Sequence, residues 1–438
     1  MKLRRLALLG WALPVFAQYA GPAILSRGEA PGSLSPPEIK FRPFVEIAGT
    51  YNTGLSGVAT TDAQGSLPNV DSYGLTVGFG VSGVHSWRHT KLSLSYLGNL
   101  ADYYQNTEYD YISQSLHLGI QHQIARHVSI SLREDGGVSS RGFGLFGLSQ
   151  TVAYDPTQAY VPTTDFFDNH TYYLSSQADA IYQRSARLSF GFGGDNFIYR
   201  YSSHSLTGSL GLGAHGDMQY RLSRHTTAGG GYRFNHFTYS RLNAATDAHS
   251  FSLSLSHSLS ARTEFSVSAG AMRVEQKFIQ NVAVDPVIAA ILGIGTTTEI
   301  SHAVVWGSVW SGRLSHVLRS GVLFANAGRS LTPGNGLFLT SYVTTVGGGY
   351  TYTGLRTWSL SALVHSNWAK SVGNIQGDYN DLAGGISASR RLMRSVHLVF
   401  GVEARQYRSP NFHNYNRLTT GAHVGLGFTP GEVPLRIW

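Results

Sequence analysis

The chain has 438 residues and a composition unlike that of a soluble globular protein. Charged residues make up 13% of it, about half of the share typical of soluble proteins, whereas glycine (51) and tyrosine (24) are abundant. The absence of cysteine excludes a disulfide framework and a thiolate metal site. The net charge is +8, but lysine and arginine are scattered singly, which argues against a nucleic-acid-binding surface.

The N-terminus has the features of a secretory signal peptide, which we expect to cover residues 1–17. Its basic start consists of Lys2, Arg4 and Arg5. An apolar stretch follows over residues 6–16, and Val15-Phe16-Ala17 forms a small-x-small cleavage site. Residues 18–42 are rich in proline, glycine and serine and are expected to form a flexible periplasmic leader. No later apolar run approaches the ~20 residues that a membrane-spanning helix needs.

From Phe44 onward, apolar residues alternate with small or polar ones, which is typical of β-strands that have one apolar face. In one example Phe251, Leu253 and Leu255 alternate with serines. The pattern predicts eighteen strands, at residues 44–54, 72–86, 89–104, 109–123, 127–139, 171–183, 186–201, 204–222, 225–240, 247–259, 262–276, 299–314, 316–330, 338–352, 356–370, 378–392, 395–408 and 415–428.

Every second connection is predicted to be a tight polar turn, at residues 86–89, 125–127, 184–186, 222–225, 259–262, 314–316, 353–356 and 392–395. The other connections are mostly longer, and this asymmetry is typical of outer-membrane barrels with both termini on the periplasmic side. A chain that enters and leaves on one side crosses an even number of times, so sixteen strands remain the alternative count. We therefore expect an all-β fold, a transmembrane antiparallel up-and-down β-barrel over residues 43–428.

Two further observations favour a membrane over a soluble double-sheet sandwich. A sandwich would expose charge on its polar face, whereas that face here consists mostly of glycine, serine and threonine. Aromatic residues also lie near both ends of the predicted strands, as two interfacial girdles require. Examples are Trp87 and Tyr220 near short turns, and Tyr104 and Trp368 near longer loops.

The last predicted strand carries a recognisable motif at Gly421, Val424, Leu426 and Phe428, a glycine followed by alternating apolar residues and an aromatic. It resembles the assembly signal of Gram-negative outer-membrane β-barrel proteins, and the whole mature chain resembles porin-like barrels in its pattern. The resemblance implies insertion by the barrel-assembly machinery. Family members usually end at that aromatic, whereas this chain continues over 429–438. Either this tail trails in the periplasm or Ile437-Trp438 supplies the terminal aromatic.

The strand positions between the apolar ones are expected to line a channel. Their ionisable members are Arg133, Asp135, Asp179, Arg187, His215, Asp217, Arg221, Arg233, Glu264, Arg313, Arg319, His365, Asp381, Arg391, His397, Glu403, Arg405 and His423. Basic residues predominate among them, which predicts a water-filled channel with a mild preference for anions or hydroxyl-rich solutes. The alternative is that these residues form solvated pairs without a role in selectivity.

Two long connections are candidates for narrowing the channel, because loops of such length are usually functional. Residues 142–169 lack periodicity and are rich in aromatic residues. Residues 277–298 contain Asp285-Pro286 before an apolar stretch, which predicts a short helix.

No motif for a catalytic nucleophile is present, and His215 and Asp217, two residues apart, are the most suggestive acid–base pair. No cofactor or metal site is expected. The sequence predicts a porin-like channel in the bacterial outer membrane for passive or weakly selective passage of small hydrophilic solutes. The alternative is a structural or surface-interaction barrel that binds a partner or polysaccharide, or a barrel for exopolysaccharide export. Membrane lipid, lipopolysaccharide and the assembly machinery are the expected partners, and a homotrimer remains possible.

Overall fold

The computed structural model describes residues 41–55, 70–139, 170–240, 242–283, 296–334, 336, 339–352, 357–372, 378–409 and 416–430. The signal peptide, nearly all of the leader, the loop at 142–169, the helix expected after Asp285 and the end of the tail lie outside these residues. Within them, no helix is long and apolar enough to cross a membrane.

Eighteen β-strands make up almost all of the described chain, together with one short 3-10 helix, η2 (Thr107–Tyr109). The strands are β1 (Arg42–Leu55), β2 (Val70–Ser86), β3 (Thr90–Tyr103), β4 (Tyr111–Ala125), β5 (Val128–Ser139), β6 (Thr171–Gln183), β7 (Leu188–Tyr201), β8 (Ser209–Arg221), β9 (Thr226–Tyr239), β10 (Ala244–Ser260), β11 (Thr263–Ala283), β12 (Thr296–Leu318), β13 (Gly321–Thr332), β14 (Ser341–Tyr352), β15 (Trp358–Ser371), β16 (Asp378–Arg391), β17 (Val396–Arg408) and β18 (Arg417–Phe428).

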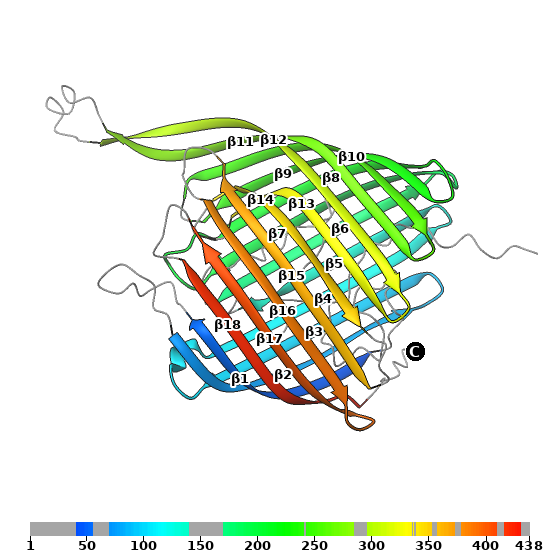
Figure 1. The fold of residues 1–438 in the computed structure, drawn as a ribbon. Helices are drawn as coiled ribbons and strands as arrows, with labels where there is room; N and C mark the ends of the chain where they lie inside the picture. The colour runs from blue at the N-terminus through cyan, green and yellow to red at the C-terminus, as the bar shows by residue number, and fades with distance from the viewer. Residues whose placement is uncertain are drawn as a thin grey trace, which may run out of the picture.

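The sheet closes on itself to form a barrel (Figure 1). Each strand pairs antiparallel with its neighbours in the sequence, and β1 pairs with β18 from Val45↔Phe428 to Thr53↔Thr420. The predicted fold class and the count of eighteen strands are therefore confirmed, and sixteen is excluded. Closure gives every strand a paired neighbour on both sides, so the paired parts of the strands can satisfy their backbone groups inside a lipid bilayer.

The outer face of the barrel is apolar. Leu253 on β10 is 60% exposed there, whereas Ser254, its neighbour in the strand, points to the other side of the sheet. The same alternation places leucine, isoleucine, valine and aromatic side chains outside on all sides of the barrel. An apolar outer surface of this kind is favourable in contact with lipid hydrocarbon and unfavourable in contact with water, so this barrel spans a membrane.

The two ends of the barrel differ in their connections. At one end the strands are joined by two to five residues, and at the other by four to 31. The start of β1 and the end of β18 both lie at the short-turn end, as the alternation predicted. At the long-loop end, β11 and β12 project beyond the other strands (Figure 1).

The predicted ends of two neighbouring strands were wrong. The sequence placed a turn at residues 314–316, but β12 continues to Leu318 and the turn consists of residues 319–320. His316 pairs with Leu323, so the polar pair Ser315-His316 belongs to the ladder. The predicted loop at 277–298 is also shorter, because β11 and β12 extend the hairpin to Ala283 and back from Thr296.

Candidate channel interior

The strand register decides which side chains share the interior face. Across β6 to β10 the cross-strand partners run from Asp179 through Gly193, His215 and Arg233 to Ser250. All of them lie opposite the exposed apolar face, and the register carries the same face around the closed ring. The interior is thus built mainly from glycine, serine, threonine and ionisable residues.

Most of the residues predicted to line a channel lie in strands on this interior face. They are Arg133, Asp135, Asp179, His215, Asp217, Arg221, Arg233, Glu264, Arg313, His365, Asp381, Arg391, His397, Glu403, Arg405 and His423. The other two lie elsewhere: Arg187 is in the β6–β7 turn and Arg319 in the β12–β13 turn. These two arginines therefore stand at the short-turn rim, and Arg319 was misplaced because the end of β12 was misjudged.

Sequence reasoning missed several interior charges. They are Arg42, Glu46, Lys91, Asp195 and Arg417. With them included, arginine and lysine outnumber the acidic residues by only one on the interior face of the described strands, so the excess of basic residues there is small. Glu46 was hard to assign because β1 carries apolar residues on both faces, with Phe44 and Ala48 inside and Val45 and Ile47 outside.

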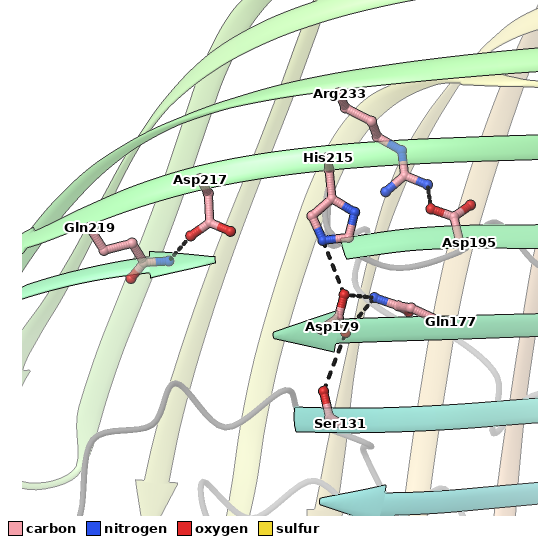
Figure 2. A network of polar contacts seen from close by, with 8 residues as sticks. All are labelled: Ser131, Gln177, Asp179, Asp195, His215, Asp217, Gln219 and Arg233. Atoms are coloured by element: carbon pink, nitrogen blue, oxygen red, sulfur yellow. Dashed lines mark hydrogen bonds and ion pairs between the residues drawn. The ribbon is translucent and has the colours of Figure 1, made fainter. Parts of the chain in front are cut away.

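One polar network crosses β5, β6 and β8 and centres on Asp179 (Figure 2). Gln177 Nε2 donates to Asp179 Oδ2 at 3.0 Å, and Ser131 Oγ donates to the same oxygen at 3.4 Å. His215 Nε2 lies 3.1 Å from Asp179 Oδ1. His215 thus pairs across the sheet, while Asp217 accepts a hydrogen bond from Gln219 at 3.4 Å. The spacing of His215 and Asp217 in the sequence therefore does not produce an acid–base pair.

A second pair lies beside this network, on β7 and β9 (Figure 2). Arg233 Nη2 is 2.5 Å from Asp195 Oδ1, and Arg233 Nε donates to Asn235 Oδ1 at 2.9 Å. Both charged groups are largely buried. A buried arginine that is held this way is neutralised by its neighbour and projects little charge into the lumen.

Glycines on the neighbouring strands let these acids lie flat against the wall. A Cβ added at Gly193 would stand 2.2 Å from Asp179 Oδ1 and 2.6 Å from His215 Cε1. Two further glycines hold the same relation to an acid, Gly191 to Asp217 and Gly213 to Asp195. The glycines therefore make room on the wall for side chains that would otherwise project inward.

Replacing Gly193 by alanine is expected to displace Asp179 and His215 and to weaken the barrel, because no contact as short as 2.2 Å can persist. The matched control is Gly194→Ala, on the outer face of the same strand, where the added Cβ would meet only Gly213 O at 3.3 Å. Heat-modifiable gel migration of the purified barrel measures the difference. Equal unfolding temperatures of the two variants would show that Gly193 does not have this role.

A third network lies on the opposite side of the ring, on β14 to β17. Arg405 Nε donates to Asp381 Oδ2 at 3.2 Å, and its Nη2 is 3.1 Å from that oxygen. Asn367 Nδ2 donates to Asp381 Oδ1 at 3.0 Å and in turn accepts from Thr345 at 2.7 Å. Asp381 is 1% exposed and Arg405 2%. The charges on this wall are therefore also held as a pair.

At the long-loop end, the ends of β13 and β14 lie inside the barrel. We call residues 330–334, 336 and 339–343 the inward flap. Thr340 is hydrogen-bonded to Tyr239, and to Thr246 at 2.7 Å, both interior residues of the facing wall. Thr207 N donates to Gly336 O at 2.9 Å. The flap thus covers the interior surface of β8 to β10.

An apolar cluster holds the inward flap in this position. Its flap members are Leu331, Leu339 and Tyr342, and its wall members include Phe197, Tyr199, Phe237, Met272, Val274 and Val309. By spacing, Leu331 and Tyr342 belong to the outer face, with Leu323 and Val346 respectively. They are nevertheless buried, because the end of this hairpin lies behind β12. The flap therefore occupies part of the barrel interior at this end.

Comparison with known proteins adds resemblances at low similarity. No protein-family model matches the chain, and no curated protein matches it. Among solved structures, Pseudomonas aeruginosa OpdO is 12% identical, with a TM-score of 0.40 over 89% of this chain and 97% of that one. Pseudomonas aeruginosa OpdK with vanillate is 9% identical, with a TM-score of 0.41 over 89% and 98%. The copper transporter OprC is 10% identical, with a TM-score of 0.41 over 90% and 68%.

The assignment of the fold rests on the chain's own strand pairing. Among the described residues, no three histidine or acidic side chains come together as a metal site would require. A closed antiparallel sheet, an apolar outer face, a polar interior and short turns at one end are the defining features of bacterial outer-membrane proteins. This chain is an outer-membrane β-barrel.

Proposed function

We propose that the protein is a porin-like channel for the passage of small hydrophilic solutes across the outer membrane. The observation that carries the proposal is the closed ring of eighteen strands with glycine, serine, threonine and paired charges on its inner face. Barrels of this size are wide enough to enclose an aqueous channel. A polar, hydrogen-bonding lumen suits solutes that exchange hydration water for hydroxyl and amide groups.

The interior charges favour weak selectivity. Two buried arginines of the interior face, Arg233 and Arg405, are each paired with an aspartate, so neither offers a free cation to a passing solute. Because acids and bases are nearly balanced, we favour neutral, hydroxyl-rich solutes such as sugars over anions. This choice narrows the sequence-based expectation, which left both open.

The direct test is electrical recording of the purified barrel in a planar bilayer. We expect stable single-channel steps and, in a gradient of potassium chloride, a reversal potential close to zero because the interior is nearly balanced. Swelling of proteoliposomes in neutral sugars checks passage of uncharged solutes. A folded barrel that gives neither conductance nor swelling would contradict the proposal.

A surface-interaction barrel is the second candidate, and one observation favours it. The part of β12 that has no β13 neighbour carries exposed Ile300 and Trp306, and Ile300 pairs with Ile279 beyond Ala244↔Phe278, the last pair of β10 with β11. Exposed apolar side chains on a projecting hairpin suit contact with a partner or polysaccharide. Absence of conductance together with retained binding of a surface partner would favour this reading.

We also propose that β18 is the segment that the barrel-assembly machinery recognises. Val424, Leu426 and Phe428 point outward in alternation, while Gly421 lies on the interior face. The strand also closes the barrel against β1. We further propose that the barrel contacts lipopolysaccharide in the membrane and assembles as a homotrimer.

A further inference from the structure

One side of β12 is unpaired along more than half of its length. β12 pairs with β13 only from Trp310 to Leu318, whereas its pairing with β11 runs from Thr296 to His316. None of the residues that the structure describes pairs with the other side of β12 between 296 and 309. An open strand edge of this kind offers a row of backbone donors and acceptors that proteins usually cover or pair.

The segment that could pair with this edge is already present in the chain. The last pair of the β12–β13 ladder is Trp310↔Arg329. In the same register, Ser330, Leu331 and Thr332 would pair with Val309, Ser308 and Gly307. Instead, these residues of β13 belong to the inward flap and lie behind β12, where a Cβ on Gly307 would stand 2.5 Å from Tyr342 Oη.

The apolar pattern of the flap fits the paired arrangement better than the inward one. If β13 continued along β12, Leu331 and Tyr342 would face outward with Leu323 and Val346, which are exposed on the outer face. The residue alternation of β13 and β14 is therefore regular for a barrel wall up to their ends. Leu331 and Tyr342 are buried only because the flap lies on the interior side of β12.

Several buried polar atoms in or near the inward flap have no hydrogen bond. Gln276 is 0% exposed, and neither its Nε2 nor its Oε1 has a partner. Gln276 is the cross-strand neighbour of Thr246, which holds the flap. Tyr342 Oη and Arg329 Nε are likewise buried without a hydrogen bond, although the Arg329 guanidinium lies over the Tyr342 ring at 5.0 Å from its centroid. Unsatisfied buried groups oppose a packed state, so the cluster holds the flap against this cost.

From these observations we infer that the ends of β13 and β14 exchange between two positions. In the inward position they narrow the channel, and in the second they extend the ladder along the open edge of β12 and leave the interior. The exchange of strands is a property of the fold, whereas its effect on passage rests on the proposed function. The chain thus contains both the inward flap and the β12 edge with which the flap can pair.

Disulfide trapping tests the exchange, and the chain contains no cysteine that would interfere. The variant Ser308→Cys/Leu331→Cys joins two residues that are opposite each other only in the extended ladder. The control Gly312→Cys/Ala327→Cys joins a pair already opposite in the structure, on the same strands and face. The two pairs are four residues apart along each strand, so the ladder geometry at both is the same.

We expect both variants to form the intramolecular disulfide in outer membranes treated with a mild oxidant, the 308–331 pair more slowly. A second pair, Thr246→Cys/Thr340→Cys, replaces hydroxyls that are 2.7 Å apart and locks the inward position. In a variant that carries both pairs, prior formation of the 246–340 bond should suppress the 308–331 bond. In bilayers, conductance should be several-fold higher with the 308–331 bond than with the 246–340 bond, and dithiothreitol should reverse both.

The inference is overturned if the 308–331 pair stays reduced while the 312–327 control oxidises. It is also overturned if the 308–331 bond forms equally fast when the 246–340 bond is present. Both readouts are chemical and need no conductance. A barrel that passes no current therefore counts against the proposed function and leaves the result on strand exchange intact.

Discussion

Single-channel conductance is expected to rise several-fold when Thr340 is replaced by aspartate. Thr340 is 0% exposed and lies between Tyr239 and Thr246 on the interior wall. An unpaired carboxylate at such a position loses its hydration without gaining a counter-ion, and that cost exceeds what a few apolar contacts supply. The cheapest way to restore its hydration is for the inward flap to leave the wall, which opens the channel.

Thr340→Ser is the matched control, since it keeps the hydroxyl and its hydrogen bonds. Conductance of this variant should stay near that of the unaltered protein. Heat-modifiable gel migration confirms that each variant has formed a barrel before it is recorded. A folded Thr340→Asp barrel with unchanged conductance would mean that the flap does not limit passage.

The largest expected loss of stability follows from replacing Asp381 by asparagine. The substitution removes the charge that faces the buried Arg405 guanidinium, whose Nε and Nη2 lie 3.2 and 3.1 Å from Asp381 Oδ2. Breaking a buried ion pair from one side typically costs about 3–5 kcal/mol, because the other charge remains in a medium that solvates it poorly. Urea-induced unfolding of the barrel in lipid vesicles, followed by gel migration, measures the change.

The double variant Asp381→Leu/Arg405→Met removes both charges and should be less destabilised than Asp381→Asn. Replacing both members of a buried pair by apolar residues is often close to neutral. If the single and double variants unfold at the same urea concentration, the loss comes from packing around these strands and not from an unpaired charge.

The fold was predictable because alternation is a local property. In β10, serine occupies every second position from Ser250 to Ser260, and each residue's face follows from its neighbours. The end of β12 was not predictable in this way, because Ser315-His316 has the composition of a turn. Only the partner strand shows that His316 continues the ladder, by placing Leu323 opposite it.

The interior site was predictable only in its membership. The alternation of side chains along each strand assigned Asp179, His215 and Arg233 to the interior face. Their partners, however, depend on the register between neighbouring strands. That His215 meets Asp179, 36 positions away, and not Asp217 follows from register alone. The inward flap was beyond sequence reasoning for the same reason, since the alternation of Leu331 and Tyr342 points outward.

Glycines face the acids on β6 to β8, and they allow the width of the free interior to change independently of the diameter of the barrel. The number of strands fixes the girth of the cylinder, but the free bore depends on how closely the polar side chains lie against its lining. A single methyl group at Gly191, Gly193 or Gly213 would lift a carboxylate off that lining. The width of the free interior can therefore change through a single added carbon atom at one of these glycines, while the barrel diameter and the number of strands stay constant.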